Sequence, residues 1–420
     1  MEVDLIIKHG SELLTLGGAE GALQRELHGA LGVIENESMA INDGKILDIG
    51  NDSEISETYE GNEIDATGKL VLPGFIDAHT HLVYAGAREN ELSLKVRGIS
   101  YRQIARRGGG IHSTVRKTRN ASKSDLKDQA KGRLDEMLRH GTTTAEVKSG
   151  YGLNTEEELK LLETIKELDE EHPIDLIPTF LGAHEIPQRY ENAPEKYVEE
   201  IIEEMIPKVA NRGLAKFCDV FVEEGVFTVE QGRKILEAGK KHGLTPRLHA
   251  DELSNLRGAE LAAQVDAISA SHLLHASKKG LQLMAKKGII GIYLPASCMA
   301  LLSETFPNGR EIIDSGLSMA LASDLNPNCW VTNLQTVLTL AVYFMRITPA
   351  EAITAATINA AASLGFEKEV GSLKKGKRAD IIIMNVPNHR WLGYKMGVNL
   401  VDTVVKNGKV EWRSPSALSD

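Results

Sequence analysis

The chain has 420 residues, of which 42% are hydrophobic and 25% are charged. This composition is typical of a globular protein and excludes collagen, coiled-coil and disordered chains. The excess of 59 acidic over 48 basic residues gives a formal net charge of −11, which argues against a general affinity for nucleic acid or anionic membranes.

The sequence indicates neither a membrane-spanning nor a secreted protein. Its best apolar run, residues 336–345, has about half of the roughly 18 residues that a spanning helix needs. Glu2, Asp4 and Lys8 stand where a signal peptide would have an apolar core. The three cysteines are far apart and form no C-x-x-C pair, so they indicate neither a disulfide framework nor a zinc ribbon. We therefore expect a cytoplasmic protein without a membrane or nucleic-acid partner.

Both ends of the chain have the pattern of β-hairpins. Residues 39–47 form two short apolar runs about Asp43-Gly44, and residues 403–410 repeat this design about Asn407-Gly408. Asp-Gly and Asn-Gly favour two-residue hairpin turns. Because the ends of a chain often lie close together, we expect residues 1–68 and 371–420 to form one small, discontinuous β-sandwich domain.

The middle of the chain, residues 69–370, has a different rhythm, in which short apolar strands alternate with amphipathic, charge-rich helices. Eight such alternations fit an α/β fold of the (β/α)8 TIM-barrel type, typically of ~250 residues, better than an open sheet. No G-x-G-x-x-G or Walker A segment indicates a nucleotide site. The helices include residues 155–171, 194–209, 229–241 and 333–345, and the strands lie near residues 71–78, 142–147, 175–181, 216–222, 247–250, 267–271, 288–294 and 318–322.

One early segment of this barrel is strongly basic. Residues 92–120 contain eight lysines and arginines and no acid. In an acidic protein such a segment indicates either a local anion site or a solvated helix face, and the sequence leaves both interpretations open.

Polar residues that can perform chemistry follow several predicted strands. His79 and His81 lie on one face at the end of the first strand, with Cα atoms about 7 Å apart, so they can bind one ion. His249 ends the fifth strand and Asp324 follows the eighth. Because barrel enzymes carry their sites at the carboxyl ends of the strands, these four side chains are expected to meet. Three imidazoles and one carboxylate predict a hydrolytic metal site.

Residues 71–81, Val-Leu-Pro-Gly-Phe-Ile-Asp-Ala-His-Thr-His, resemble the first-strand motif of the amidohydrolase superfamily. The resemblance covers nearly the whole chain. Within the superfamily, the sequence is similar to the imidazolonepropionase family, through residues 85–88, 108–111, 146–153, 180–184 and 324–327.

The resemblance implies hydrolysis of 4-imidazolone-5-propanoate to N-formimino-L-glutamate in histidine degradation, with one Zn or Fe ion per chain and a homodimer. It implies that His79, His81, His249 and Asp324 are the metal ligands and that Glu252 and His272 are a polar catalytic pair. It places Arg88, Tyr101, Tyr151, His184 and Asn326 around the anionic substrate. The sequence departs from the family where Asn328-Cys329 replaces Gly-Ser, which bears on contacts with the carboxylate end of the substrate.

The chemistry of the residues agrees with this interpretation. A bound metal lowers the pKa of water from about 16 to about 7, and Asp324 can accept the proton of that water. His272 can stabilise the oxyanion and Glu252 can protonate the departing ring nitrogen. The planar guanidinium of Arg88 suits a carboxylate. From sequence alone, Tyr101 and Tyr151 fit core packing at least as well as substrate contact.

Two other functions remain as alternatives at this point. The His249 to Glu252 spacing also suits a mononuclear deaminase of the same superfamily, although a purine or pyrimidine offers no carboxylate to Arg88. The other alternative is a non-catalytic assembly protein on the same fold, but the sequence has a residue that can ligate metal at all four ligand positions. Binuclear members of the superfamily bridge their two ions with a carboxylated lysine on the fourth strand. Here the fourth strand ends without a lysine and Lys148 ends the second strand instead, so one metal ion is expected rather than two.

Overall fold

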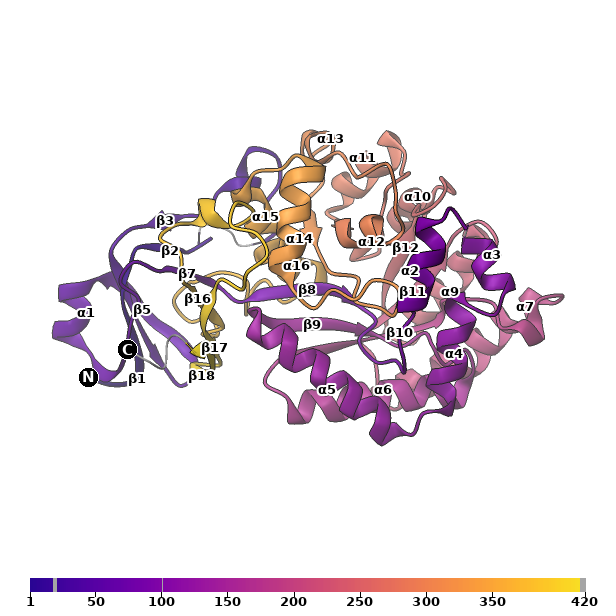
Figure 1. Ribbon diagram of the computed structural model, residues 1–420, viewed down its shortest axis with the longest axis horizontal. Coiled ribbons are helices and arrows are strands. Elements are labelled where there is room, and N and C mark those ends of the chain that lie inside the picture. Colours follow the sequence, from indigo (N-terminus) through magenta and orange to yellow (C-terminus); the bar gives the residue numbers. More distant parts are fainter. Residues whose placement is uncertain (18–20, 100, 416–420) are drawn as a thin grey trace.

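The computed structural model describes residues 1–17, 21–99 and 101–415. Figure 1 shows an elongated molecule with a helix-rich body at one end and a small β body, which holds both termini, at the other. No helix within the described ranges is long and apolar enough to cross a membrane.

The larger body contains an eight-stranded parallel sheet in sequential order, whose first and last strands also lie in contact. This confirms the predicted (β/α)8 barrel, since each of the eight predicted segments overlaps one strand of this sheet. A parallel bridge from Thr80 to Leu325 joins the two edges of the sheet. The strands are β8 (Phe75–Thr80), β9 (Thr142–Lys148), β10 (Asp175–Ala183), β11 (Phe217–Val222), β12 (Thr245–Ala250), β13 (Ser269–His272), β14 (Ile290–Tyr293) and β15 (Met319–Leu321).

The helices around the barrel begin where the sequence supplies caps. The side chain of Asn154 accepts a hydrogen bond at the start of α6 (Thr155–Glu171), and Thr228 forms a capping box on α9 (Val229–Lys241). Both helices have the predicted bounds. The other barrel helices are α2 (Glu89–Val96), α3 (Tyr101–Arg106), α4 (Gly110–Asn120), α5 (Lys123–Arg139), α7 (Pro194–Glu200), α8 (Ile206–Asn211), α10 (Gly258–Gln264), α11 (Lys278–Lys287), α12 (Pro295–Ala300), α13 (Gly309–Asp314), α14 (Leu334–Leu340), α15 (Pro349–Ala355) and α16 (Ile358–Leu364).

Short helical segments of other types complete the helical part. Single π turns at Ile201–Met205 and Ala341–Met345 continue α7 and α14, within the predicted ranges 194–209 and 333–345. The 3-10 turns of the described residues lie at Arg25–Gly29, Gln188–Tyr190 and His389–Trp391.

The small body consists of two sheets, as expected for a β-sandwich. One has the order β5-β4-β1-β6 and the other β18-β17-β16-β7-β2-β3. The two predicted hairpins are confirmed, because β4 pairs with β5 across Asp43-Gly44 and β17 pairs with β18 across Asn407-Gly408. The strands are β1 (Glu2–Gly10), β2 (Glu12–Leu14), β3 (Val33–Ile34), β4 (Glu37–Asn42), β5 (Lys45–Asn51), β6 (Glu60–Asp65), β7 (Leu70–Pro73), β16 (Ile381–Met384), β17 (Val401–Lys406) and β18 (Lys409–Arg413), and the helix α1 spans Asp52–Thr58.

The prediction of one barrel strand over residues 71–78 is wrong in its first half. β7 pairs with β2 and β16 in the small body, and only β8 belongs to the barrel. The chain passes between the two bodies at Gly74, where a Cβ atom would lie 2.3 Å from Thr143 Oγ1. Apolar residues on both sides of Gly74 hide this break in the sequence. The predicted domain limits at residues 68 and 371 stay a prediction.

Ion pairs hold the small body against the amino end of β10. Lys406 Nζ lies 2.7 Å from Asp175 and 2.6 Å from Asp380, and Arg378 pairs with the same two carboxylates. Lys406 and Asp380 are buried. A buried charge is costly when its partner is removed, so this cluster depends on all its members.

Replacing Lys406 with Met is therefore expected to lower the free energy of unfolding by about 3 kcal/mol, because Asp380 keeps only the Arg378 cation. Urea denaturation followed by circular dichroism measures the loss. A variant as stable as the wild type would show that the cluster contributes nothing to the junction.

Candidate active site

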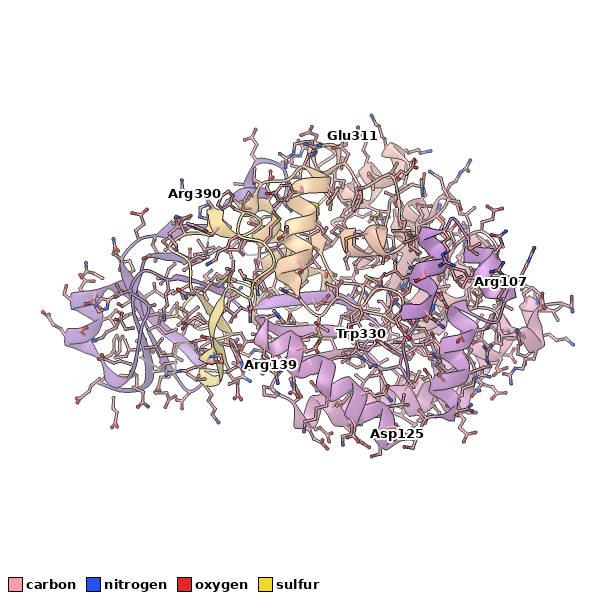
Figure 2. All side chains as sticks on the ribbon, viewed as in Figure 1. Arg107, Asp125, Arg139, Glu311, Trp330 and Arg390 are labelled. Carbon is pink, nitrogen blue, oxygen red and sulfur yellow. The ribbon has the colours of Figure 1, made fainter. Side chains whose placement is uncertain are left out.

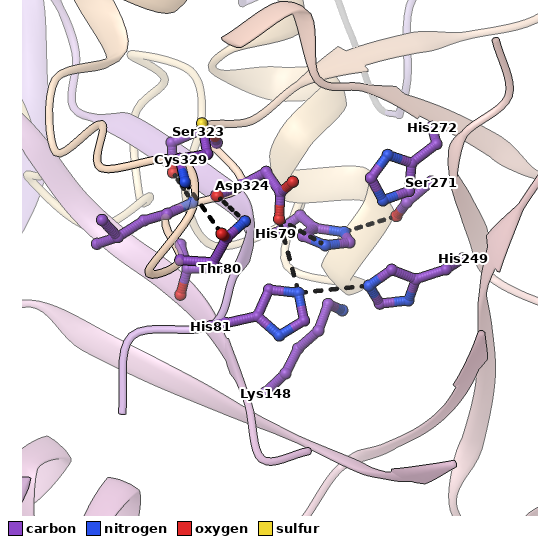
Figure 3. A network of polar contacts seen from close by, with 12 residues as sticks. His79, Thr80, His81, Lys148, His249, Ser271, His272, Ser323, Asp324 and Cys329 are labelled. Carbon is purple, nitrogen blue, oxygen red and sulfur yellow. Dashed lines mark hydrogen bonds and ion pairs between the residues drawn. The ribbon is translucent and has the colours of Figure 1, made fainter. Parts of the chain in front are cut away.

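Three imidazoles meet at the carboxyl end of the barrel (Figure 3). His79 lies in β8, His81 follows that strand directly, and His249 lies in β12. One ring nitrogen from each lies within 4.8 Å of the other two, and the Nε2 atoms of His81 and His249 are 3.4 Å apart. All three side chains are buried. The structure thus brings together the three predicted nitrogen ligands.

Asp324 reaches the same point from the segment after β15. Its Oδ1 atom lies 3.6 Å from Nε2 of both His79 and His81. Asp324 has a φ of +52°, and its backbone N–H donates to His79 O at 3.1 Å. A left-handed backbone is unfavourable for a residue with a Cβ, so the surrounding structure enforces the turn that aims this carboxylate.

The donor set fits one metal ion. His79 Nε2 is buried and has no hydrogen-bond partner among the described residues. The other ring nitrogens of two imidazoles are occupied, since His79 Nδ1 bonds Ser271 Oγ at 2.8 Å and His249 Nδ1 donates to Asp219 Oδ1 at 3.1 Å. Burial lowers the pKa of His79 and His81 well below the ordinary value, which keeps both rings neutral. Such orientation of the outer nitrogen is typical of histidines that ligate metal.

A buried charged layer lies beneath the imidazoles. Lys148, the last residue of β9, lies 2.7 Å from Glu146 Oε1 and 2.8 Å from Asp219 Oδ2. Burial alone would raise the pKa of Asp219, but Lys148 and His249 beside it hold this pKa well below its usual range. Glu146, Asp219 and Ser271 were not predicted as site residues. For Glu146 and Asp219 the available signal was a carboxylate within a buried strand, where charge is rare, whereas uncharged Ser271 gave no such signal.

The predicted catalytic pair lies beside the imidazoles. His272 ends β13 with a φ of +72°, and its Nδ1 atom lies 3.5 Å from Glu252 Oε1. Burial, together with the charges of Asp324 and Glu223, raises the pKa of Glu252 well above its ordinary range. His272 Nε2 is buried and makes no hydrogen bond within the described ranges. The pair thus offers a carboxyl that retains its proton and an uncommitted imidazole nitrogen.

A cavity of about 230 Å³ opens next to this pair. Its wall includes Glu252 and His272 together with apolar side chains such as Leu294, Cys298 and Leu301. A concave, largely apolar space with a few convergent polar groups is the usual form of a small-molecule site.

His184 and Tyr151 lie against the ring of His81. The His184 ring stacks on His81 with centroids 4.8 Å apart, and its Nδ1 atom bonds Gly150 O at 3.0 Å. Burial lowers the pKa of His184 to about 3, so this ring is neutral. The Tyr151 ring lies 5.3 Å from that of His184 and is buried. Glu158 holds the loop of Tyr151 by accepting from three of its backbone N–H groups.

Arg88 is not exposed, as an arginine without a functional role would ordinarily be. Its side chain is 8% exposed, and Nη2 lies 2.7 Å from Glu91 Oε2. Glu91 in turn accepts from Gly110 N at 2.8 Å, which fixes the carboxylate that orients the guanidinium. Tyr101 begins α3, but its side chain lies outside the described residues.

The loop after Asp324 is organised by Asn326. Its Oδ1 atom accepts from the backbone N–H groups of Asn328 at 2.8 Å and Cys329 at 3.0 Å. Asn328 Oδ1 accepts from Lys95 Nζ at 3.0 Å. Cys329 is buried, with its thiol 3.7 Å from Ser323 O, so this thiol turns towards the protein core. The predicted contacts of Asn326, Asn328 and Cys329 with substrate stay a prediction.

The basic segment of residues 92–120 forms parts of α2, α3 and α4. Several of its cations are engaged by the main chain, whereas Arg107 lies at the edge of the molecule in Figure 2 and is exposed. Lys95, Arg116, Lys117 and Arg119 donate to the carbonyl oxygens of Ala300, Gly108, Ala87 and Gly152 respectively. These four cations therefore tie the helices and loops of this region together.

Comparison with known proteins gives the family. Residues 70–410 match the model of the amidohydrolase family. The imidazolonepropionase of Geobacillus sp. strain WCH70 is 48% identical over 417 residues, which cover 98% of each chain. That of Brevibacillus brevis is 49% identical over 96% of this chain and 97% of its own.

Solved structures share the fold at much lower identity. The guanine deaminase of E. coli has a TM-score of 0.73 at 16% identity, covering 97% of this chain and 99% of its own. A zinc-bound adenosine deaminase from Xanthomonas campestris has a TM-score of 0.71 at 15% identity, covering 98% and 93%. At this identity the likeness concerns the fold alone, so it does not favour the deaminase alternative. On the strength of its full-length relatives, the chain belongs to the amidohydrolase family and, within it, to the imidazolonepropionases.

Proposed function

We propose that this protein hydrolyses the ring amide C–N bond of 4-imidazolone-5-propanoate to give N-formimino-L-glutamate, a step of histidine degradation. The observation that carries the proposal is the convergence of three buried imidazoles and Asp324 beside Glu252 and His272. It occurs in a chain 48% identical, over 98% of its length, to an imidazolonepropionase.

One Zn or Fe ion is proposed per chain, held by His79, His81, His249 and Asp324. Such an ion, when bound, polarises a carbonyl and lowers the pKa of water to about 7. A single ion suits the charged layer, because Lys148 is paired with two carboxylates and offers no bridging group.

Three side chains around the ion have different roles in proton transfer and hydrogen bonding. Asp324, whose carboxylate faces the imidazoles, accepts the proton of the attacking water. His272 donates from Nε2 to the carbonyl oxygen as negative charge develops there. Glu252, which its surroundings keep protonated, donates its proton to the departing ring nitrogen so that the nitrogen leaves as a neutral group.

The remaining residues would bind and orient the substrate. The Arg88 guanidinium pairs with the propanoate carboxylate through parallel hydrogen bonds. Neutral His184 and Tyr151 pack beside the imidazolone ring, and the loop of Asn326, Asn328 and Cys329 contributes to the carboxylate end. Tyr101 is assigned there by resemblance only. A homodimer and a cytoplasmic location belong to the same proposal.

The function is tested by following the loss of imidazolone absorbance with the purified enzyme. Formation of N-formimino-L-glutamate, with no ammonia released from a panel of aminopurines and aminopyrimidines, is the expected result. Ammonia release without turnover of the imidazolone would instead establish a deaminase.

Metal content should be one equivalent per chain in the fully active enzyme, since four ligands converge on one point. Dialysis against a chelator should abolish activity, and adding Zn²⁺ should restore it. Inductively coupled plasma mass spectrometry gives the stoichiometry. Two equivalents in a fully active sample would contradict the single site.

Replacing Arg88 with Lys should raise KM chiefly, because an ammonium cannot reproduce the two parallel hydrogen bonds of a guanidinium. A charged hydrogen bond contributes about 1.5 to 3 kcal/mol, so kcat/KM should fall about tenfold to a hundredfold. Steady-state kinetics measure the change. If both Arg88→Lys and Arg88→Ala had the wild-type KM, Arg88 would not bind the substrate.

Replacements of His249 and Glu252 should fail in different ways. His249→Ala should lose metal and activity together, whereas Glu252→Gln should retain metal and lose roughly 10²- to 10⁴-fold in kcat. His272→Ala should also retain metal and lose about 10²- to 10³-fold. Metal analysis and kcat, measured on the same samples, separate these outcomes. A Glu252→Gln protein without metal, or with near-normal kcat, would exclude Glu252 as the proton donor.

A further inference from the structure

The buried Lys148 has no part in the reaction described above, although it lies directly beneath the imidazoles. Figure 3 shows its ammonium beside the rings of His81 and His249. The side chain is fully buried and its two ion-pair distances, to Glu146 and Asp219, are both below 3 Å. A lysine is almost never buried unless it is paired, so this position calls for a specific role.

The contacts form one continuous line from Lys148 to the metal centre. Lys148 Nζ contacts Asp219 Oδ2, and the other oxygen of that carboxylate accepts from His249 Nδ1 at 3.1 Å. A carboxylate held by both oxygens cannot rotate. The direction of the His249 ring, and therefore of its Nε2 atom, is thus fixed by two charged groups.

Lys148 is itself held from the opposite side. Glu146 Oε1 contacts the ammonium and also accepts from Thr179 Oγ1, while Glu146 Oε2 accepts from Thr80 N at 3.3 Å. Through these bonds β8, β9, β10 and β11 all constrain the position of the ammonium. Without the ammonium, Glu146 would keep only the Arg247 guanidinium, 4.0 Å from its Oε1 atom, and Asp219 would keep only the His249 ring.

We propose that Lys148 is a positioning residue of the metal centre, which holds Asp219 against His249 and so directs His249 Nε2 at the ion. This inference rests on the proposed function, because it concerns the ion that the reaction needs. Loss of a residue that orients a metal-ligating histidine typically weakens metal affinity by about 10- to 100-fold.

Charge alone predicts the opposite effect. Arg247 also pairs with Glu146, at 4.0 Å, so Glu146, Asp219, Lys148 and Arg247 together carry no net charge. Removal of the ammonium would leave one net negative charge, which attracts a cation more strongly. The sign of the change in metal affinity therefore distinguishes orientation from simple repulsion.

The test is the Zn²⁺ affinity of the apo-protein, measured by competition with a chromophoric chelator in the absence of substrate. Lys148→Met should bind Zn²⁺ about 10- to 100-fold more weakly than the wild type. Lys406→Met is the matched control, since Lys406 is also buried between two carboxylates but lies in the small body. It should lose stability and keep a wild-type affinity for Zn²⁺.

A double-mutant cycle shows whether Lys148 acts through Asp219. Asp219→Asn should weaken Zn²⁺ binding to a similar extent, and adding Lys148→Met should cause little further loss. The proposal would be overturned if Lys148→Met bound Zn²⁺ as tightly as the wild type or more tightly. It would also be overturned if the affinity losses of the two single variants multiplied in the double variant, or if Lys406→Met lost as much Zn²⁺ affinity as Lys148→Met. If Lys148→Met does not fold, unchanged affinity in Asp219→Asn overturns it instead.

These outcomes are distinct from failure of the proposed function. A wild-type protein that binds no Zn²⁺ and does not turn over the imidazolone would contradict the function. If the wild type binds Zn²⁺ and turns over the imidazolone, and Lys148→Met has the same Zn²⁺ affinity, only the role of Lys148 would be contradicted.

Discussion

The site depends on burying imidazole nitrogens that the protein does not satisfy by itself. His79 Nε2 has no hydrogen-bond partner within the described ranges, and Nε2 of His81 and His249 face each other across 3.4 Å. A buried polar atom without a partner costs about 1 to 3 kcal/mol. A metal ion between the rings would give His79 Nε2 a partner and would replace the contact between His81 and His249, so an arrangement that is unfavourable for the bare protein favours binding of an ion.

The barrel sustains this arrangement by enforcing unusual backbone at the strand ends. Asp251, His272 and Asp324 all have a positive φ, and each lies at the carboxyl end of a barrel strand or just beyond it. Such residues persist only where the surrounding contacts determine them. The carboxylate of Asp251, for example, accepts from the backbone N–H groups of Leu256, Gly258 and Ala259 and so closes the turn that follows His249. Stability supplied by the barrel core thus supports the local strain that aims the reactive groups.

Much of this was predictable because it follows local rules. The helix at residues 155–171 has both a cap and an apolar period, and the hairpins at Asp43-Gly44 and Asn407-Gly408 have their turn residues. His79, His81 and His249 could be placed together because parallel strands end at one edge. Asp219 could not be found in this way, since its role depends on a side-chain contact with His249 on the neighbouring strand. Likewise, nothing local distinguishes β7 from β8, and pairing with the distant strands β2 and β16 separates them.

We assign the ion to His79, His81 and His249 together. X-ray absorption spectroscopy of the Zn²⁺-loaded protein tests this assignment most directly, because imidazole ligands produce a characteristic multiple-scattering pattern. This assignment predicts three imidazole nitrogens at about 2.0 to 2.1 Å and at least one oxygen ligand, with no sulfur. A shell with fewer than three imidazoles, or one that contains the sulfur of a cysteine, would contradict it.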